Sequence, residues 1–305
     1  MAKIIPEYPK IIPELEYSGN YQTAINKKSL KYLLLSLFFY KRVDKNNLIY
    51  LKESFSQNLH FMPLFSMTKA LAHYNDYFKS ENTEDKNLFI KVAEKLIETS
   101  DEFGWKHNNL LQLPGYPPKI ESYSCLHNGR GLGVLIRYYQ YNKSAAVINL
   151  ITNILKNFET ESDLGGVQRP DGVFLEYSWG NDSPVVWNGF MSALIGLYDC
   201  HLYGPKEVKS NSKNIFDKGM EKLIAYQDRL FYDGNSLKWI RYDDNKLYFA
   251  DGPYMNIEIR QLQYLSNIDS RLKKSLNKMG KINLSNRKIA NIYEYYYFIK
   301  KRLMK

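Results

Sequence analysis

The stretch that decides the fold runs from Pro170 to Asp199 and reads PDGVFLEYSWGNDSPVVWNGFMSALIGLYD. Its second half opens a segment, from Trp187 to Tyr203, in which apolar residues fall on every side of a helix. A helix without a polar face has to be buried. Small residues share one of its faces and predict the close approach of a neighbouring helix: Gly189, Ser192, Ala193 and Gly196.

The first half of the same stretch predicts a short strand that ends in Glu176-Tyr177, directly before the buried helix. Packing explains the helix, but it does not explain an acid beside a phenol at its entrance. Neighbours in a regular strand point to opposite faces. We therefore expect a bulge or turn from Tyr177 to Gly180, or else a site that uses only one of the two side chains.

Helical periodicity recurs along most of the chain. Some segments are amphipathic and others are apolar all round, which predicts a mainly α fold with an inner ring of helices wrapped by an outer one. The predicted helices span 27–43, 60–79, 85–100, 126–141, 143–159, 185–203, 211–229, 255–267 and 287–303.

Two stretches rich in Gly and Asp predict short β-hairpins. The first spans 165–179 with its turn at Pro170-Asp171-Gly172, and the second spans 232–252 with its turn at Asp243-Asp244-Asn245. Each hairpin leads into a predicted inner helix. We therefore expect the cleft of the protein where these hairpins end.

Length and composition fit one large domain or two small ones, because 44% of the 305 residues are hydrophobic. Three prolines predict an extended arm over residues 1–20. Residues 21–270 then form the main domain, and residues 271–305 form a basic helical tail packed on it.

The positive charge of the chain is concentrated at its end. The net charge is +10, and residues 268–305 hold eleven Lys or Arg against Asp269 and Glu294, a net of +9. Such a tail is either a solvated face or a surface for a polyanion or an anionic membrane. Nucleic acid is not expected as a partner, because no zinc-finger, helix-turn-helix or RNP pattern occurs.

Several kinds of site are not expected. The five histidines show no metal-ligand spacing, and no G-x-S-x-G elbow occurs, so we predict no metal and no cofactor. Gly129, Gly131 and Gly133 lack the βαβ context of a nucleotide site and are interpreted as a tight loop at a helix start. Cys125 and Cys200 are interpreted as small buried apolar residues.

No predicted segment is suited to secretion or membrane insertion. The sequence MAKIIPEYPK has no apolar signal region, and the longest apolar run, from Tyr32 to Tyr40, is too short to cross a bilayer. These features predict a cytoplasmic chain without an integral membrane segment.

Four stretches together resemble one known family. They are SYSCLHNGRGLGVLIRYY, FLEYSWGNDSPVVWNGFMSALIGLYD, LKWIRY and YMNIEIRQLQYLSNID. Their order and spacing, from Tyr123 to Asp269, are similar to the C-terminal domain of the heparosan and heparan D-glucuronyl C5-epimerases. The resemblance implies an incomplete (α/α) toroid, a tendency to form homodimers, and an acidic polysaccharide in which C5 of D-glucuronic acid is inverted to give L-iduronic acid.

The resemblance also implies the roles of particular residues. The residues that match its catalytic positions are Glu176, Tyr177, Arg241 and Tyr254. We expect the substrate to contact Lys238, Tyr242, Asn188, Arg260, Gln261, Tyr123 and Arg130. Two positions depart from the family pattern, because Lys238 stands where a further Tyr is common and the family's His-Ile-Asn-Gln is Glu258-Ile259-Arg260-Gln261 here.

The reaction explains why these groups are needed. The C5 hydrogen lies next to a carboxylate, so a cation such as Arg241 must neutralise that carboxylate before the proton leaves. A base is needed on one face of the sugar and an acid on the other, and Glu176 and Tyr254 come from separate segments. Tyr is a weak base, with a pKa of about 10, unless a nearby cation lowers that pKa.

Two alternatives start from the same residues. The C5 carbanion can instead expel the oxygen on C4, which makes the protein a polysaccharide lyase. A domain that binds uronate glycans without turning them over is the other alternative.

Overall fold

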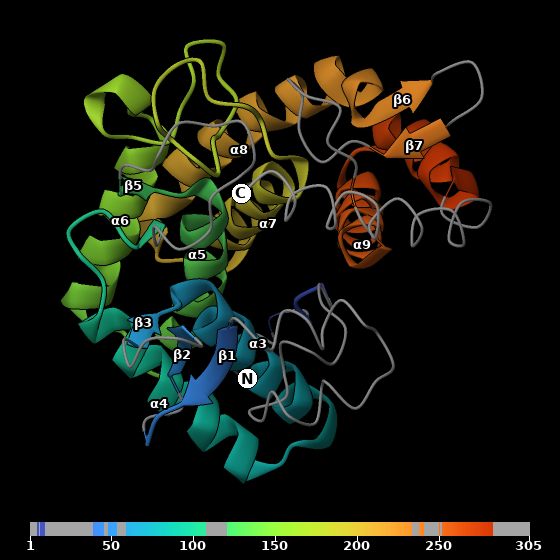
Figure 1. The fold of residues 1–305 in the computed structure, drawn as a ribbon. Helices are drawn as coiled ribbons and strands as arrows, with labels where there is room; N and C mark the ends of the chain where they lie inside the picture. The colour runs from blue at the N-terminus through green and yellow to red at the C-terminus, as the bar shows by residue number, and fades with distance from the viewer. Residues whose placement is uncertain are drawn as a thin grey trace.

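The computed structural model describes residues 5, 7–9, 39–45, 48–53, 59–107, 121–233, 238–240, 250 and 252–282 (Figure 1). The helices are α3 (Pro63–Ser80), α4 (Thr83–Glu98), α5 (Cys125–Tyr139), α6 (Ala145–Phe158), α7 (Trp187–Tyr203), α8 (Lys206–Tyr226) and α9 (Gly252–Ile268). Residues 273–282 are helical as well. The prediction of a mainly α protein is confirmed.

The strands are short. They are β1 (Phe39–Val43), β2 (Ile49–Glu53), β3 (Leu59–Phe61), β4 (Lys106–His107), β5 (Ser122–Tyr123), β6 (Phe231–Asp233) and β7 (Lys238–Ile240). All pairings among them are antiparallel, in the order β1-β2-β3, β4-β5 and β6-β7. The 3₁₀ turns among the described residues are η1 (Ser162–Leu164), η2 (Gln227–Leu230) and η3 (Ser270–Leu272).

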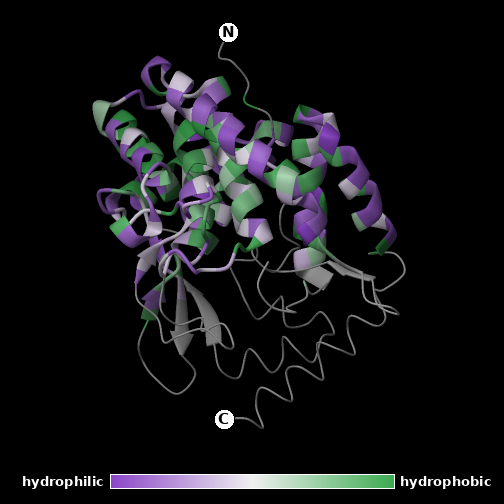
Figure 2. Cartoon of the chain, turned by 90° about the horizontal axis from the view of Figure 1, so that it is seen from above, coloured by the Kyte–Doolittle hydropathy of each residue, from purple (hydrophilic) through white to green (hydrophobic). Residues whose placement is uncertain are grey.

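The helices form two layers. In the inner row α3 packs on α5, α5 on α7, and α7 on α9, while α4, α6 and α8 lie outside them (Figure 1). The burial of the two layers differs as the sequence predicts, since 14 of the 15 residues of α5 are buried but only one stripe of α6 is. Figure 2 shows hydrophobic residues gathered on the central helices and more hydrophilic ones along the outer helices.

The inner helices all run in the same direction. Along α3, α5 and α7, residues in the first half of one helix contact the first half of the next, and residues near the end contact residues near the end; on α9, Gln261 contacts the first turn of α7 and Tyr264, nearer the end, contacts Asp199. The early pairs are Thr68 with Arg130 and Gly129 with Ala193, and the late pairs are Tyr74 with Arg137, Arg137 with Asp199, and Asp199 with Tyr264. The segments that enter α5, α7 and α9 therefore gather at one end of the row.

Glycines let α5 and α7 approach closely. A Cβ on Gly129 would lie 2.5 Å from the Cα of Ala193, and a Cβ on Gly196 would lie 2.0 Å from the backbone oxygen of Gly129. The interpretation of Gly129, Gly131 and Gly133 as a loop at a helix start is thus wrong, because all three lie inside α5. The small-residue face predicted on α7 is confirmed at Ala193 and Gly196.

Two predicted helices are wrong in part, since residues 60 and 61 of the predicted helix 60–79 belong to β3. Residues 39–43 of the predicted helix 27–43 form β1, which pairs with β2. The segment FYKRV is rich in aromatic and β-branched residues, which favour strands, and its pairing with IYLKE outweighs the weak helical pattern. The rest of that predicted helix, and the predicted helix 287–303, lie outside the described residues.

The two hairpins differ from their predictions in detail. The turn at Asp171-Gly172 forms, with a φ of 88° at Gly172 and a hydrogen bond from Arg169 N to Val173 O of 2.9 Å. No strand forms around it, and only an isolated bridge joins Gln168 to Phe174. In the second stretch β6 pairs with β7, and the predicted turn at residues 243–245 lies outside the described residues.

Part of the predicted N-terminal arm enters the core. Ile5 is fully buried, and Tyr8 is 2% exposed. The Tyr8 backbone and the Asn75 side chain exchange two hydrogen bonds of 3.0 Å, and the Arg137 guanidinium lies over the Tyr8 ring. These contacts join the start of the chain to the inner helices.

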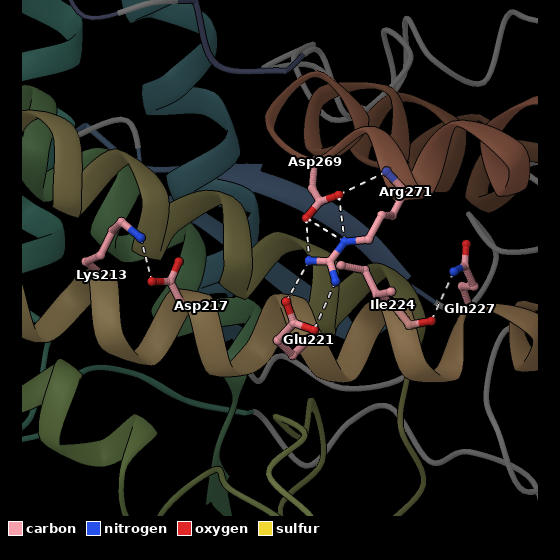
Figure 3. A network of polar contacts seen from close by, with 7 residues as sticks. All are labelled: Lys213, Asp217, Glu221, Ile224, Gln227, Asp269 and Arg271. Atoms are coloured by element: carbon pink, nitrogen blue, oxygen red, sulfur yellow. Dashed lines mark hydrogen bonds and ion pairs between the residues drawn. The ribbon is translucent and has the colours of Figure 1, made fainter.

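The start of the basic tail is joined to α8 by an exposed ion-pair network. Arg271 lies 2.6 Å from Glu221 on α8 and 2.7 Å from Asp269, and the same Asp269 accepts from the Arg271 backbone N–H (Figure 3). Leu272 and Met279 are fully buried behind it.

Candidate active site

The segment that carries Glu176 is held against the start of α5 by hydrogen bonds on both sides of Glu176. The Cys125 N–H donates to the Leu175 carbonyl at 2.9 Å, and the Ser178 hydroxyl donates to the Tyr123 carbonyl at 2.7 Å. The Glu176 side chain is 4% exposed and lies against Gly189 in the first turn of α7. A Cβ at position 189 would be 2.5 Å from Glu176 Oε2, so Gly189 makes room for the carboxyl group.

The surroundings of Glu176 make it a group that titrates near neutral pH. Burial raises the pKa of Glu176 to about 7, against the opposing effects of a hydrogen bond from Tyr177 and the positive charge of Arg130. Within the part of the chain that the structure describes, Oε2 has no hydrogen-bond partner. A carboxyl group of this kind can both take and give a proton at neutral pH.

The turn predicted after Glu176 is confirmed. Trp179 N donates to Tyr177 O at 3.1 Å and Ser183 N to Gly180 O at 3.0 Å, while Gly180 has a φ of 129°. This turn replaces the regular strand, so Glu176 and Tyr177 are both buried. The Tyr177 ring packs on Trp179, with 4.9 Å between the ring centroids, and on Val186.

Three other predicted site residues are buried between the inner helices. Gln261 Nε2 donates to the Asn188 carbonyl at 2.9 Å and so ties α9 to the first turn of α7. Arg130 is 2% exposed and donates to Thr68 Oγ1 on α3. Their direct contact with a substrate stays a prediction.

Tyr254 lies in the first turn of α9 and is 37% exposed. Its spacing places it on the same side of the helix as Glu258 and Gln261, both of which are fully buried. Arg260 is exposed instead, so two of the predicted substrate-binding residues, Arg260 and Gln261, lie on different sides of α9.

Two predicted residues lie outside the described part of the chain. They are Arg241, expected to neutralise the substrate carboxylate, and Tyr242. Lys238 is placed only by its backbone, which pairs with Asp233 in the β6-β7 hairpin. The cation of the proposed site stays a prediction.

A cavity of about 400 Å³ adjoins the Glu176 turn. Residues that line it are Lys106, Glu121, Ser122, Tyr123, Ser162, Asp163, Gly165, Ser178, Trp179 and Gly180. Tyr123 belongs to this wall, whereas Glu176, Tyr177 and Tyr254 are not among these residues. Sequence reasoning missed Ser178 and Trp179, although they directly follow the Glu-Tyr pair.

Tyr123 is a wall residue and not a proton carrier. Burial, followed by its hydrogen bond to Asp101, raises the pKa of Tyr123 well above the usual value of a phenol. Its ring stands edge-on to Phe103, and the Lys106 ammonium lies 5.5 Å from the ring centroid. The phenol therefore stays neutral over the whole physiological range.

The two cysteines behave as the sequence predicts. Both are free and buried, and burial raises the pKa of Cys200 to about 12 and that of Cys125 well above the usual thiol value. Neither thiol is therefore available as a thiolate nucleophile.

Neither a metal-ligand cluster nor a membrane span is found within the described ranges. There, no group of three or more His, Cys, Asp or Glu gathers as ligands for a metal ion. Of the helices the structure describes, none combines the length and apolarity needed to cross a bilayer.

Comparison with known proteins agrees with this geometry. The family described as "D-glucuronyl C5-epimerase C-terminus" matches residues 116–281, which is more than half of the 305 residues. A D-glucuronyl C5-epimerase from Caenorhabditis elegans is 28% identical over 130 residues, which cover 38% of this chain and 20% of that protein. The chain thus matches about a fifth of that relative's length. The matched region contains α5 to α9, with Glu176 and Tyr254, and the chain belongs to the D-glucuronyl C5-epimerase C-terminal family.

Proposed function

We propose that this chain catalyses C5-epimerisation of D-glucuronyl residues to L-iduronyl residues within an acidic polysaccharide. Membership of the family supports a glucuronyl epimerase. The observation that carries the proposal is the buried Glu176, with a pKa of about 7, at the end of the inner helices where α9 begins; Tyr254 lies in the first turn of α9.

The proposed reaction moves one proton off C5 and one proton onto it. Either Glu176 or Tyr254 takes the C5 proton, and the electron pair of the broken C–H bond spreads into the adjacent carboxylate. The other group then donates a proton to the opposite face of C5, so no atom or electron is gained or lost. Tyr177 holds the Glu176 carboxyl group by its hydrogen bond.

The helix arrangement supports binding of an acidic sugar at this end. The N-termini of α5, α7 and α9 carry partial positive charge, and each favours a nearby anion by about 0.3–1 kcal/mol. The buried positive charge of Arg130 also favours an anion here, since it acts to lower the pKa of Glu176 against the effect of burial. Arg241, together with Lys238, would supply the cation that neutralises the substrate carboxylate.

The architecture supports the same proposal. The inner row of α3, α5, α7 and α9 with α4, α6 and α8 outside it is the arrangement from which an (α/α) toroid is built. We infer an incomplete toroid over residues 21–270, with an arm at 1–20 and a basic tail at 271–305 that steers the polyanion. We also propose that the chain forms a homodimer, and this part of the proposal rests on the family resemblance alone.

The experiment that tests the function is incubation with an unsulfated glucuronate polymer in heavy water. We expect deuterium at C5 without cleavage of the polymer. Glu176→Gln and Tyr254→Phe should each lower the exchange rate by about 10²–10⁴-fold, which is the usual contribution of a positioned acid or base. Tyr141→Phe is the matched control, because Tyr141 and Tyr254 are both 37% exposed.

Two outcomes would contradict the proposal. An unsaturated, ultraviolet-absorbing uronate would show a lyase. Binding without any exchange at C5 would show a glycan-binding domain.

A further inference from the structure

A side chain from the start of the chain lies inside the row of inner helices. Tyr8 is 2% exposed, and its backbone exchanges two hydrogen bonds of 3.0 Å with Asn75 in the second half of α3. The neighbouring Glu7 lies 2.6 Å from Lys79 of the same helix. The backbone of this segment is therefore fixed along α3, and the Tyr8 side chain reaches the other inner helices.

The ring of Tyr8 lies against α5. A Cβ on Gly133 would be 2.8 Å from Cε2 of the ring, so the absence of a side chain at position 133 makes room for it. The Arg137 guanidinium lies 5.2 Å from the ring centroid, and Arg137 pairs with Asp199 of α7. The ring thus occupies the interior on the side where α5 and α7 share a buried ion pair.

The phenol group of Tyr8 faces Arg130 of α5 and Ser192 of α7. Burial raises the pKa of Tyr8, while the charge of Arg130 and then the hydroxyl of Ser192 act to lower it. Arg130 and Ser192 lie at the tight crossing of the two helices, since a Cβ on Gly129 would be 2.7 Å from the Ser192 carbonyl oxygen. One residue therefore joins α3, α5 and α7 beside Arg130.

Arg130 links Tyr8 to the candidate active site. Its guanidinium is buried and donates to Thr68 of α3. Among the described residues, Arg130 is the charged group that acts on Glu176, where its charge opposes the effect of burial. The position of Arg130 therefore affects how tightly Glu176 binds its proton.

The other titratable groups that face Glu176 among the described residues are uncharged. Tyr177, on the same segment, donates a hydrogen bond to it. Cys125 comes from α5, and burial, followed by the Glu176 carboxylate, raises the pKa of its thiol. From α7, Gly189 lies against the carboxyl group and does not titrate. An effect of Tyr8 on the protonation of Glu176 would therefore act through Arg130.

We propose that Tyr8 is a positioning residue of the active site, which fills the space between α3, α5 and α7 and thereby keeps Arg130 next to Glu176. The proposal rests on the proposed function, since it takes Glu176 to be a catalytic residue. It implies that the start of the chain, which the sequence predicts as an extended arm, is part of what prepares the site for proton transfer.

The first test asks whether Tyr8 changes the energetic cost of the Glu176 carboxylate. Tyr8→Phe keeps the ring on Arg137 and removes the oxygen that faces Arg130. Urea denaturation at pH 9 and pH 4 then measures the stability gained by Glu176→Gln, once in the wild-type background and once in Tyr8→Phe. This readout does not depend on epimerase activity.

The sign of the expected change follows from the charge of Arg130. That charge acts to lower the pKa of Glu176, so a displaced Arg130 leaves the pKa further above its ordinary value and makes the buried carboxylate more destabilising at pH 9. We expect Glu176→Gln to lower the unfolding equilibrium constant about twofold to tenfold more in Tyr8→Phe than in wild type, the size of one hydrogen bond. At pH 4 the two gains should be equal, because Glu176 is protonated in both states.

Tyr74→Phe is the matched control. Tyr74 is also buried, and its ring lies 5.3 Å from the same Arg137 guanidinium, but the charges that act on its phenol are those of Arg137 and Asp199. It should leave the effect of Glu176→Gln unchanged at both pH values. An equal change in Tyr74→Phe and Tyr8→Phe would overturn the proposal, and so would the absence of a change in Tyr8→Phe.

A second pair of variants moves the ring without altering Tyr8. Gly133→Ala places a Cβ against the Tyr8 ring and should change the effect of Glu176→Gln in the same direction as Tyr8→Phe. Gly131→Ala is the control in the same helix, because its Cβ would lie 2.2 Å from the Trp105 ring instead. It should destabilise the protein and leave the effect of Glu176→Gln unchanged. Equal responses in both glycine variants would show a general distortion of α5 and would overturn the proposal.

The same change should appear in the pH profile of deuterium uptake at C5. Tyr8→Phe should move the inflection above pH 7 by about 0.3–1 pH unit, which is the same twofold to tenfold, with an unchanged KM for the polymer. Tyr74→Phe should leave the inflection in place. A lower rate in Tyr8→Phe without a shift of the inflection would show that Tyr8 only supports the fold.

The failures of the two proposals can be told apart. If the wild-type protein exchanges deuterium at C5 but Tyr8→Phe leaves the effect of Glu176→Gln on stability unchanged, the role of Tyr8 is wrong and the epimerase stands. If that effect changes in Tyr8→Phe but no exchange occurs in the wild type, Tyr8 positions Arg130 beside Glu176 in a protein that is not an epimerase.

Discussion

Buried charge occurs at both ends of the inner helices, and the two ends treat it differently. At the far end Arg137 and Asp199, each 1% exposed, lie 2.7 Å apart, and Tyr264 donates to the second Asp199 oxygen at 3.2 Å. Tyr8 and Tyr74 place their rings about the Arg137 guanidinium at 5.2 and 5.3 Å. Both carboxylate oxygens of Asp199 are thus satisfied.

At the other end Glu176 keeps one carboxylate oxygen without a hydrogen-bond partner among the described residues, and burial raises its pKa to about 7. Paired burial fixes the arrangement of the helices, whereas incomplete pairing leaves a group ready to exchange a proton. The difference indicates a structural end and a chemical end of one helix row.

The largest effect is expected at the structural end. Asp199→Ala leaves the Arg137 guanidinium buried without its carboxylate, so we expect a loss of about 3–5 kcal/mol in the free energy of unfolding. Urea denaturation measures it. Asp217→Ala, which removes the partner of Lys213 on the exposed side of α8, is the control and should change little. A loss as small as that of the control would mean that the two ends do not differ.

At the chemical end, replacing the buried carboxyl group is expected to raise the free energy of unfolding instead of lowering it. The pKa of Glu176 is about 7 in the folded protein and 4.5 as the ordinary value, so the folded state binds the proton more tightly. Below pH 4.5 Glu176 is protonated in both the folded and the unfolded state and does not destabilise the fold. As the pH rises above 7, the buried carboxyl group destabilises the folded state by about 3 kcal/mol. Glu176→Gln should therefore equal the wild type near pH 4.5 and exceed it in stability by up to about that amount at pH 8.

Denaturation of Glu176→Gln and wild type at both pH values checks this prediction. The same variant should lose epimerisation, so stability and activity should change in opposite directions. A variant that is less stable than wild type at pH 8 would show that Glu176 is a paired structural residue like Asp199.

A smaller loss is expected between the two ends, where α5 meets α7. Gly129→Ala forces a Cβ to within 2.5 Å of the Ala193 backbone, and overpacking of this kind costs about 1–3 kcal/mol. Gly280→Ala is the matched control in helical residues 273–282, because a Cβ there meets nothing within 4 Å. It should gain up to about 1 kcal/mol from helix propensity. A gain in both variants would rule out the tight crossing.

The smallest effect is expected for Arg271, whose ion pairs resemble those of Arg137 in geometry but are exposed to solvent (Figure 3). We expect Arg271→Ala to leave the Tm unchanged within experimental scatter, because solvent and salt screen such pairs. Calorimetry measures the Tm. A clear fall in Tm would show that the exposed ion pairs of Arg271 stabilise the fold as the buried pair of Arg137 does.

The sequence predicted much of the helical framework because long periodic segments carry their own signal. The stripe over 143–159 became α6 (Ala145–Phe158), and the apolar segment from Trp187 became α7. Strand β1 was missed because five residues carry no clear period and their pairing partner lies elsewhere. The role of Gly129 could not be predicted, because only the position of Ala193 in space reveals the close contact.

The candidate site was predicted in part. Neighbouring residues of a strand point to opposite faces, and this alternation was enough to predict the turn after Glu176. The apolar sequence of α7 was enough to place Glu176 at the start of a buried helix. The raised pKa of Glu176 depends on how deeply that segment is buried, which no local pattern reports. The cavity was missed because its walls come from three segments that only the fold brings together.

The most direct test of the account is the pH dependence of deuterium uptake at C5 of a glucuronate polymer. The account predicts uptake by the wild-type protein with an inflection near pH 7, and loss of that inflection together with most of the rate in Glu176→Gln. An inflection near pH 4.5, or uptake that Glu176→Gln leaves unchanged, would contradict the role given to this buried carboxyl group.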